Sequence, residues 1–257
     1  MPEVSVSILI PYCLARYEVD NLRGCLASLR AQTVQPKEIL VGDDSHPDDV
    51  PLVQSVCEEF GAKYIPLPFT YWAPAWSRKM NGLFYASTGE MVVLLCSNWQ
   101  LGENWLEEMV KWLEELGRGH IIVCDNARHD MGRADGTRYD WYAGREDRFE
   151  EPDYSLLDMG YLHIFYRNDW VDWDEDYDPP PGYDGRDIGA WHAITEWAFQ
   201  MIVMNAMKLM VRRDLKATHL WNKSKHPRAS TSEYLQQTRN SFSRFRQVMM
   251  ARNIKVN

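Results

Sequence analysis

The sequence predicts a single α/β domain in which a mainly parallel sheet is flanked by helices, followed by a basic helical extension at the C-terminus. Short apolar runs rich in β-branched residues alternate with segments of helical periodicity, an order typical of a parallel sheet wound with helices. With 257 residues, of which 45% are hydrophobic and 25% charged, the chain can bury one substantial core. The regular alternation ends near residue 125, so we divide the chain into residues 1–125, residues 126–229 of the same domain, and the extension 230–257.

Strands and helices follow one another in strict alternation through the first half. Apolar or alternating runs predict strands, and apolar residues at helical spacing, such as Leu22, Leu26 and Leu29, predict helices. The predicted strands cover residues 5–10, 38–41, 63–66, 91–95 and 121–124, and the predicted helices cover residues 21–31, 50–60, 75–86 and 105–116. The resulting order is β-α-β-α-β-α-β-α-β.

The second half is less regular. Residues 126–158 are polar and contain glycine, which predicts a long connection without structure of its own, placed over a site. We expect a strand over 161–166, a long apolar helix over 188–210 and a strand over 216–220. A final helix is expected to begin at Ser230 or Ser232.

Composition excludes several classes of protein. The N-terminal apolar stretch alternates as a strand does and has no basic leader, and no later apolar run is long enough to cross a bilayer. The five cysteines are scattered without CxxC spacing, which indicates a reducing compartment and no zinc site. We therefore expect a cytoplasmic protein without a transmembrane segment.

Charge is distributed unevenly along the chain. Residues 207–257 hold twelve Lys or Arg and two acids, about +10, whereas the first 206 residues carry about −19. The segment 232–257 mixes aromatic and basic residues, so it could lie on an anionic membrane, follow a phosphate backbone, or pack on the acidic body of the same chain. The sequence leaves these three alternatives open.

Polar side chains follow three of the predicted strands, at the ends where open parallel sheets bind ligands. These residues are Pro11 and Tyr12, then Asp43, Asp44 and Ser45, then Cys96, Ser97 and Asn98. Carboxylates can accept hydrogen bonds from a base N–H or a ribose hydroxyl, and the Tyr12 ring could stack on a base. The alternative is that Asp44 and Ser45 only form a turn and a helix cap.

The run VSILIPYCLARYEVDNLRGCLASLRAQTVQPKEILVGDDS resembles the opening of family 2 glycosyltransferases, which have a Rossmann-like, A-type glycosyltransferase fold. The later run KMNGLFYASTGEMVVLLCSNWQLGENWLEEM is similar to their K..N.G...A.GE segment, metal motif and following helix. Together the matching pieces cover about residues 4–110 in the correct order.

The resemblance implies a donor site for a nucleotide-sugar, with UDP as the nucleotide. It places Pro11, Tyr12, Asp43 and Asp44 at the nucleoside, and Arg78, Lys79, Asn81 and Ser97 near the rest of the donor. A cation at Lys79 or Arg78 could meet the diphosphate. The alternative for Lys79 is a solvated charge on a helix surface.

One departure from the family concerns the divalent cation, Mn²⁺ or Mg²⁺. Where the family carries Asp-x-Asp, this chain has Cys96, Ser97 and Asn98, and neutral Asn and soft Cys are poor ligands for hard cations. We expect metal binding to be weak, replaced or lost. Asn98 and His219 are the candidate ligands that remain, with His226 a weaker one, although His219 could equally be a half-buried structural histidine.

A general base is needed because an acceptor hydroxyl is a poor nucleophile until its proton is removed. The stretch PPGYDGRDIGAWHAI resembles the family region that supplies this acid, which implies Asp187 as the base and Asp184 as the second choice. The alternative is that Asp187 only caps a helix. A nearby acidic and aromatic stretch, residues 169–178, would suit a carbohydrate acceptor, but a charge run is more often a solvated loop, which we favour.

The sequence thus predicts a glycosyltransferase that moves a sugar from a UDP-sugar to an acceptor hydroxyl with inversion. The acceptor could be a glycan, a protein, a lipid-linked sugar or a modified nucleic acid. Two alternatives stay open: a catalytically silent nucleotide-sugar-binding protein, favoured by the altered metal motif, and a partner protein docked on nucleic acid or peripherally on a membrane, favoured by the basic tail.

Overall fold

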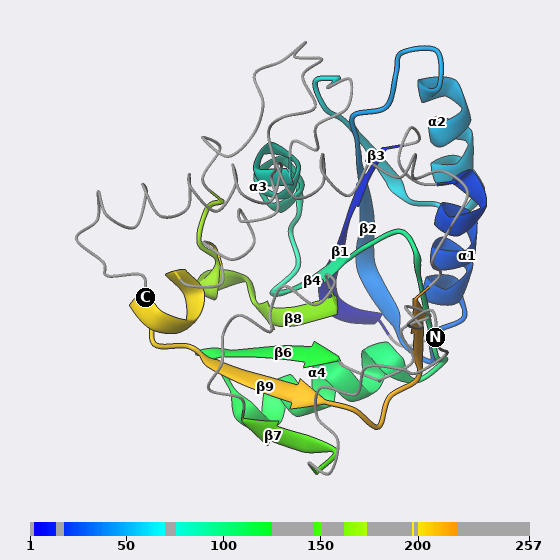
Figure 1. Cartoon of the computed structure of the whole chain (residues 1–257). Coiled ribbons are helices and arrows are strands. Elements are labelled where there is room, and N and C mark those ends of the chain that lie inside the picture. Colours follow the sequence, from blue (N-terminus) through cyan, green and yellow to red (C-terminus); the bar gives the residue numbers. More distant parts are fainter. Residues whose placement is uncertain are drawn as a thin grey trace, which may run out of the picture.

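An eight-stranded sheet organises the computed structural model, which describes residues 3–13, 18–69, 76–124, 146–150, 162–173, 197 and 200–219 (Figure 1). The strands lie in the order β3-β2-β1-β4-β8-β6-β9-β7. Their bounds are β1 Glu3–Tyr12, β2 Gln35–Asp43, β3 Lys63–Pro66, β4 Met91–Leu95, β6 His120–Cys124, β7 Arg148–Glu150, β8 Leu162–Tyr166 and β9 Lys208–Arg212. A separate two-stranded sheet joins β5 (Trp99–Leu101) and β10 (Ala217–His219).

The sheet is mainly parallel, as predicted. Strand β1 pairs in parallel with β2 and β4, β2 pairs in parallel with β3, and β6 pairs in parallel with β9. Strand β8 runs antiparallel between β4 and β6, and β7 runs antiparallel to β9. The carboxyl ends of β1, β2, β3 and β4 therefore lie at the same end of the sheet, where polar groups after each strand can meet.

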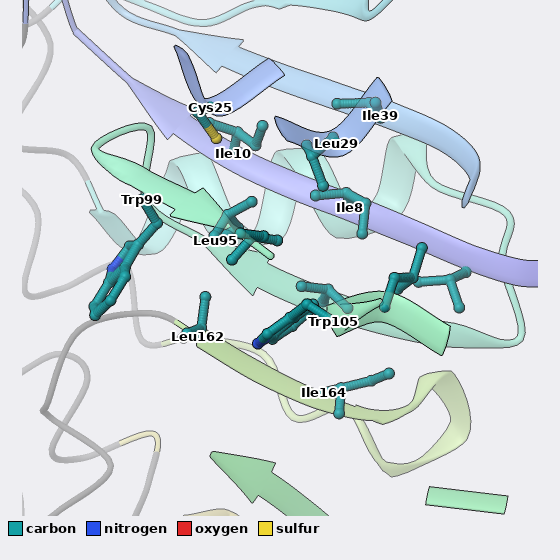
Figure 2. Packing of buried hydrophobic residues seen from close by; sticks show 14 of the residues in the cluster. Ile8, Ile10, Cys25, Leu29, Ile39, Leu95, Trp99, Trp105, Leu162 and Ile164 are labelled. Atoms are coloured by element: carbon teal, nitrogen blue, oxygen red, sulfur yellow. The ribbon is translucent and has the colours of Figure 1, made fainter. Parts of the chain in front are cut away.

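Helices cover both faces because successive side chains of a strand point to opposite sides. Ile8 packs with α1 (Val19–Arg30), α2 (Val50–Glu59) and α4 (Trp105–Leu116) in one core cluster, whereas Leu9 packs with α3 (Trp76–Ala86) in the other. Figure 2 shows the first cluster, where Cys25 and Leu29 of α1 meet the strands and Trp105 lies beside Ile164 of β8. This packing fixes helix α3 against the strands whose ends carry the polar residues.

Helix α1 is tied to α4 through the buried side chain of Gln32. Its amide nitrogen donates to the carbonyl oxygens of Ser28 (2.9 Å) and Gly102 (2.8 Å). Its amide oxygen accepts the backbone N–H of Leu106 (2.8 Å), one of the first N–H groups of α4, which have no partner within the helix. Gln32 lies in the first of the two runs that resemble family 2 glycosyltransferases, and these contacts give this position a structural reason to be glutamine.

The elements of the first half lie within three residues of their predicted bounds. Two short strands were missed: β5, and β7 within the segment that was expected to have no structure. The predicted helix over 188–210 is wrong at its end, because the described part contains a π-helix at Gln200–Met204 and then strand β9. Ala206 has a positive φ of 52°, which ends the helical segment. In β9 the buried apolar residues Leu209 and Val211 lie on either side of the half-buried Met210, as in a strand.

Other predictions are answered only for part of the chain. The five cysteines are free thiols, and no helix in the described ranges is long and apolar enough to span a membrane. The extension 230–257 lies outside the described residues, so its helix and its anionic contact stay predictions, as does the division into three segments.

Candidate functional site

Polar groups gather at the carboxyl ends of β1, β2 and β3. We call the set formed by Asp43, Asp44, Ser45, Tyr64 and Lys79 the aspartate cluster. Parallel pairing sets Tyr12 beside Asp43 and Asp43 beside Pro66, so the ends of three strands adjoin here. Helix α3, on one face of the sheet, adds Lys79 to the cluster.

Asp43 is held by three hydrogen bonds although it is almost fully buried. Its Oδ1 accepts the backbone N–H of Ser45 at 3.0 Å and the Ser45 hydroxyl at a shorter distance, and its Oδ2 accepts the Tyr64 hydroxyl at 3.1 Å. Burial raises the pKa of Asp43, against the lowering effect of these hydrogen bonds. The pKa of Tyr64 is raised by burial and by the neighbouring Asp43.

Asp44 forms a buried ion pair with Lys79. The Lys79 Nζ lies 2.6 Å from Asp44 Oδ1, and the two side chains are 2% and 1% exposed, respectively. The same Nζ donates to the carbonyl oxygen of Tyr12 at 3.2 Å, so one ammonium group ties α3 to the ends of β1 and β2. The interpretation of Lys79 as a solvated surface charge is therefore wrong, and Asp44 is not a helix cap, since α2 begins at Val50 after Asp49.

Tyr12 contributes its backbone to the cluster, because its ring is buried in the core with no exposed surface. Burial raises the pKa of its hydroxyl, with the Asp43 charge as the next cause. Arg78, also on α3, is half-buried.

Asn81 has a structural role that the sequence did not predict. Its amide nitrogen donates to the Trp173 carbonyl oxygen at 2.9 Å, and its amide oxygen accepts the Trp173 N–H at 2.8 Å. Asn81 therefore fixes the segment after β8 to helix α3. Its place near the donor stays a prediction, and these contacts make Asn81 a residue that positions the segment after β8.

The segment after β4, where the family carries its metal motif, is buried and neutral. Cys96 belongs to the core, Ser97 has no exposed surface, and Asn98 is also buried. The strand β5 that follows pairs with β10 so that Trp99 lies opposite His219, which brings His219 close to Asn98 along the backbone. The side chain of His219 lies outside the described residues.

These residues do not fit a site for Mn²⁺ or Mg²⁺. Both cations prefer charged oxygen ligands, and the three side chains at the motif offer a thiol, a hydroxyl and a neutral amide. Among the described residues, no three His, Cys, Asp or Glu side chains come together as a possible metal site.

Two carboxylates of the acidic stretch 169–178 are described: Asp169 is partly buried and Asp172 is exposed, so a solvated loop over most of the stretch stays a prediction. Asp169 accepts hydrogen bonds from Arg118 (3.2 Å) and the backbone N–H of Gly119 (3.0 Å), and Asp172 accepts from Trp170 (3.0 Å). Trp173 is buried in the core. Residues 174–178, and both candidate bases Asp184 and Asp187, lie outside the described residues.

Sequence reasoning missed Tyr64 as a member of the cluster. The signal was present, because Tyr64 lies in the predicted strand 63–66, which follows the predicted strand 38–41 along the chain. It lies two residues before the end of β3 and pairs with Val41 of β2. The cluster as a whole places two carboxylates and one ammonium group at the ligand-binding end of a parallel sheet. Such an arrangement can bind the N–H and hydroxyl groups of a nucleoside.

Comparisons with known proteins agree with the fold described above. The family model described as glycosyl transferase family 2 matches residues 7–171. The structure of S. aureus TarS 1-349 in complex with UDP-GlcNAc is 14% identical, with a TM-score of 0.61 over 90% of this chain and 61% of that one. The structure of GalNAc-T7 with UDP, GalNAc and Mn²⁺ is 13% identical, with a TM-score of 0.63 over 93% of this chain and 47% of that one.

A longer crystal structure of S. aureus TarS is 16% identical and has a TM-score of 0.55, with 88% of this chain and 38% of that one covered. The chain therefore spans less than two thirds of the length of these similar proteins. At these identities the likeness establishes a shared fold. No curated protein sequence matches the chain.

Proposed function

This chain belongs to glycosyl transferase family 2 and has the A-type glycosyltransferase fold, and from this premise we propose that it transfers a sugar from a UDP-sugar to an acceptor hydroxyl with inversion. The observation that carries the proposal is the aspartate cluster, which occupies the ligand-binding end of the sheet with two buried carboxylates. UDP is favoured because S. aureus TarS and GalNAc-T7, which share the fold, are both described with UDP or a UDP-sugar.

In the proposed complex, Asp43 accepts a hydrogen bond from the nucleoside. A carboxylate offers about four lone-pair positions, and Ser45 and Tyr64 occupy three of those on Asp43. The remaining position suits a base N–H or a ribose hydroxyl. Because Asp43 is buried, such a donor would also stabilise its ionised form, which burial disfavours.

Asp44 and Lys79 act as a unit in this proposal. The contact with Lys79 fixes the direction of the Asp44 carboxylate, while the second contact of Lys79 to the Tyr12 carbonyl holds the end of β1 in place. A charged acceptor that is fixed before the ligand arrives loses little freedom on binding, which favours affinity for the nucleoside.

Proton removal from the acceptor is assigned to Asp187, with Asp184 as the alternative, on the family resemblance alone. A carboxylate with an ordinary pKa suffices, because proton transfer accompanies bond formation to the sugar carbon. The acceptor class stays open among a glycan, a protein, a lipid-linked sugar and a modified nucleic acid.

A panel of nucleoside diphosphates and nucleotide-sugars tests the donor assignment by thermal shift. A ligand present at about 100 times its Kd raises the free energy of unfolding by about 2.7 kcal/mol, which is readily detected as a higher Tm. We expect UDP and at least one UDP-sugar to raise the Tm, with purine nucleotides at the same concentration as the control. If no member of the panel raises the Tm, the proposal is contradicted.

A second function is favoured by one specific observation, the neutral residues Cys96, Ser97 and Asn98 at the metal motif. A chain that kept the fold and lost the charge-stabilising group could bind nucleotide-sugars without turning them over. Binding of UDP-sugar without release of UDP, with and without Mn²⁺, would support this alternative.

A further inference from the structure

The three residues after β4 are neutral at the position where the family carries two carboxylates and where the diphosphate of the nucleotide is expected. Cys96, Ser97 and Asn98 are 6%, 0% and 9% exposed and carry no charge at neutral pH. In an Asp-x-Asp motif the same positions present two carboxylates, which repel a diphosphate until a cation lies between them. Here that repulsion is absent from the start.

Cys96 is turned into the core instead of toward a ligand. It packs in the cluster that contains Cys25 of α1, and the Cys25 thiol lies 3.9 Å from the Cys96 carbonyl oxygen, to which it donates. The neighbouring Ser97 hydroxyl is fully buried and has no hydrogen-bond partner among the described residues. A buried hydroxyl without a partner is unfavourable, so a ligand oxygen that accepted its hydrogen would stabilise it.

The two carboxylates described at the carboxyl ends of these strands are already used within the aspartate cluster. Asp43 accepts three hydrogen bonds, and Asp44 is neutralised by Lys79 at 2.6 Å. Recruiting Asp44 to a divalent cation would bring that cation close to the buried Lys79 ammonium group, which like-charge repulsion opposes. In the part of the chain that the structure describes, the ligand set for a hard cation is therefore neither charged nor clustered.

We propose that this chain binds UDP, and the UDP part of its donor, without a divalent cation. The inference rests on the proposed function, since it concerns the same donor site. It departs from GalNAc-T7, a protein of this fold whose structure is described with both UDP and Mn²⁺. The neutral motif lowers the need for a cation, because it lacks the carboxylate charge that would repel the diphosphate, and the Ser97 hydroxyl supplies a hydrogen-bond donor.

Calorimetric titration of the full chain with UDP tests this, once in EDTA and once in excess Mn²⁺. We expect the two Kd values to agree within about twofold, which is about 0.4 kcal/mol. Binding that is tighter in Mn²⁺ by about tenfold or more would overturn the inference and leave the proposed function standing. Absence of UDP binding in both buffers would instead refute the proposed function, and the inference with it.

A charge restored at the motif supplies the reciprocal test. Asn98→Asp should weaken UDP binding in EDTA by about tenfold, since one carboxylate returns beside the diphosphate, and Mn²⁺ should recover most of that loss. The matched control is Asn104→Asp, which makes the same change at the exposed residue before α4 and should alter neither Kd. If Asn98→Asp binds UDP in EDTA as tightly as the parent does, the charge argument is wrong. If this variant does not fold, the titrations of the parent chain decide the inference.

Discussion

Replacing Asp44 by asparagine should lower the free energy of unfolding by about 3 kcal/mol, because it leaves the Lys79 ammonium group buried without its counter-charge. Loss of one partner from a buried ion pair typically costs about 3–5 kcal/mol, and we expect the low end of that range because Lys79 keeps its hydrogen bond to the Tyr12 carbonyl. Urea unfolding followed by the fluorescence of the eleven tryptophans measures the loss.

The double variant Asp44→Asn/Lys79→Met separates the ion pair from other effects. With both charges removed, the free energy of unfolding should return to within about 1 kcal/mol of the parent, so the two single losses should not add. UDP affinity should stay reduced in the double variant by about tenfold or more, because the charged acceptor for the nucleoside is still missing. Single losses below about 1 kcal/mol, or losses that add, would refute the assignment of a desolvated pair.

Three other changes test separate parts of the account. Asp187→Asn should keep UDP binding and lose sugar transfer by about 100-fold or more, and a variant Asp184→Asn that is inactive in its place would move the base to that residue. Asp43→Asn should gain stability relative to the parent as the pH rises from about 4 to about 7, because the raised pKa of Asp43 favours the folded state only while the carboxyl is protonated; a constant difference in urea unfolding would contradict this. Asn81→Ala should lower the free energy of unfolding by about 2–4 kcal/mol, since both backbone groups of Trp173 lose their partner, and a loss below about 1 kcal/mol would show that water replaces the amide.

The first half of the fold was predictable because its strands and helices have clear and different periods. Leu22, Leu26 and Leu29 lie one helical turn apart and are all buried on α1. The failure at residues 205–210 has a physical reason. Leu209 and Val211 alternate as in a strand, but Met207 and Met210 continue the apolar run around them, so the period of two is hidden within a sequence that also suits a buried helix.

The candidate site was predictable where strand ends alone determine position. Asp43 and Asp44 lie where a parallel sheet was expected to place them. The partner of Asp44 was not predictable, because whether Lys79 faces solvent or the sheet depends on how helix α3 packs. The family resemblance placed Asn81 near the donor, but it did not indicate that Asn81 contacts Trp173, which is 92 residues away in sequence.

Release of UDP from a panel of UDP-sugars, measured with the parent chain and with Asp187→Asn at equal occupancy by the UDP-sugar, tests whether the chain is a sugar transferase with Asp187 as its base. We expect the parent to release UDP from at least one donor, and Asp187→Asn to bind the same donor but release UDP about 100-fold more slowly. A parent chain that binds UDP-sugars and releases UDP from none of them, with or without Mn²⁺ and candidate acceptors, would contradict the account and identify the chain as a silent nucleotide-sugar-binding protein.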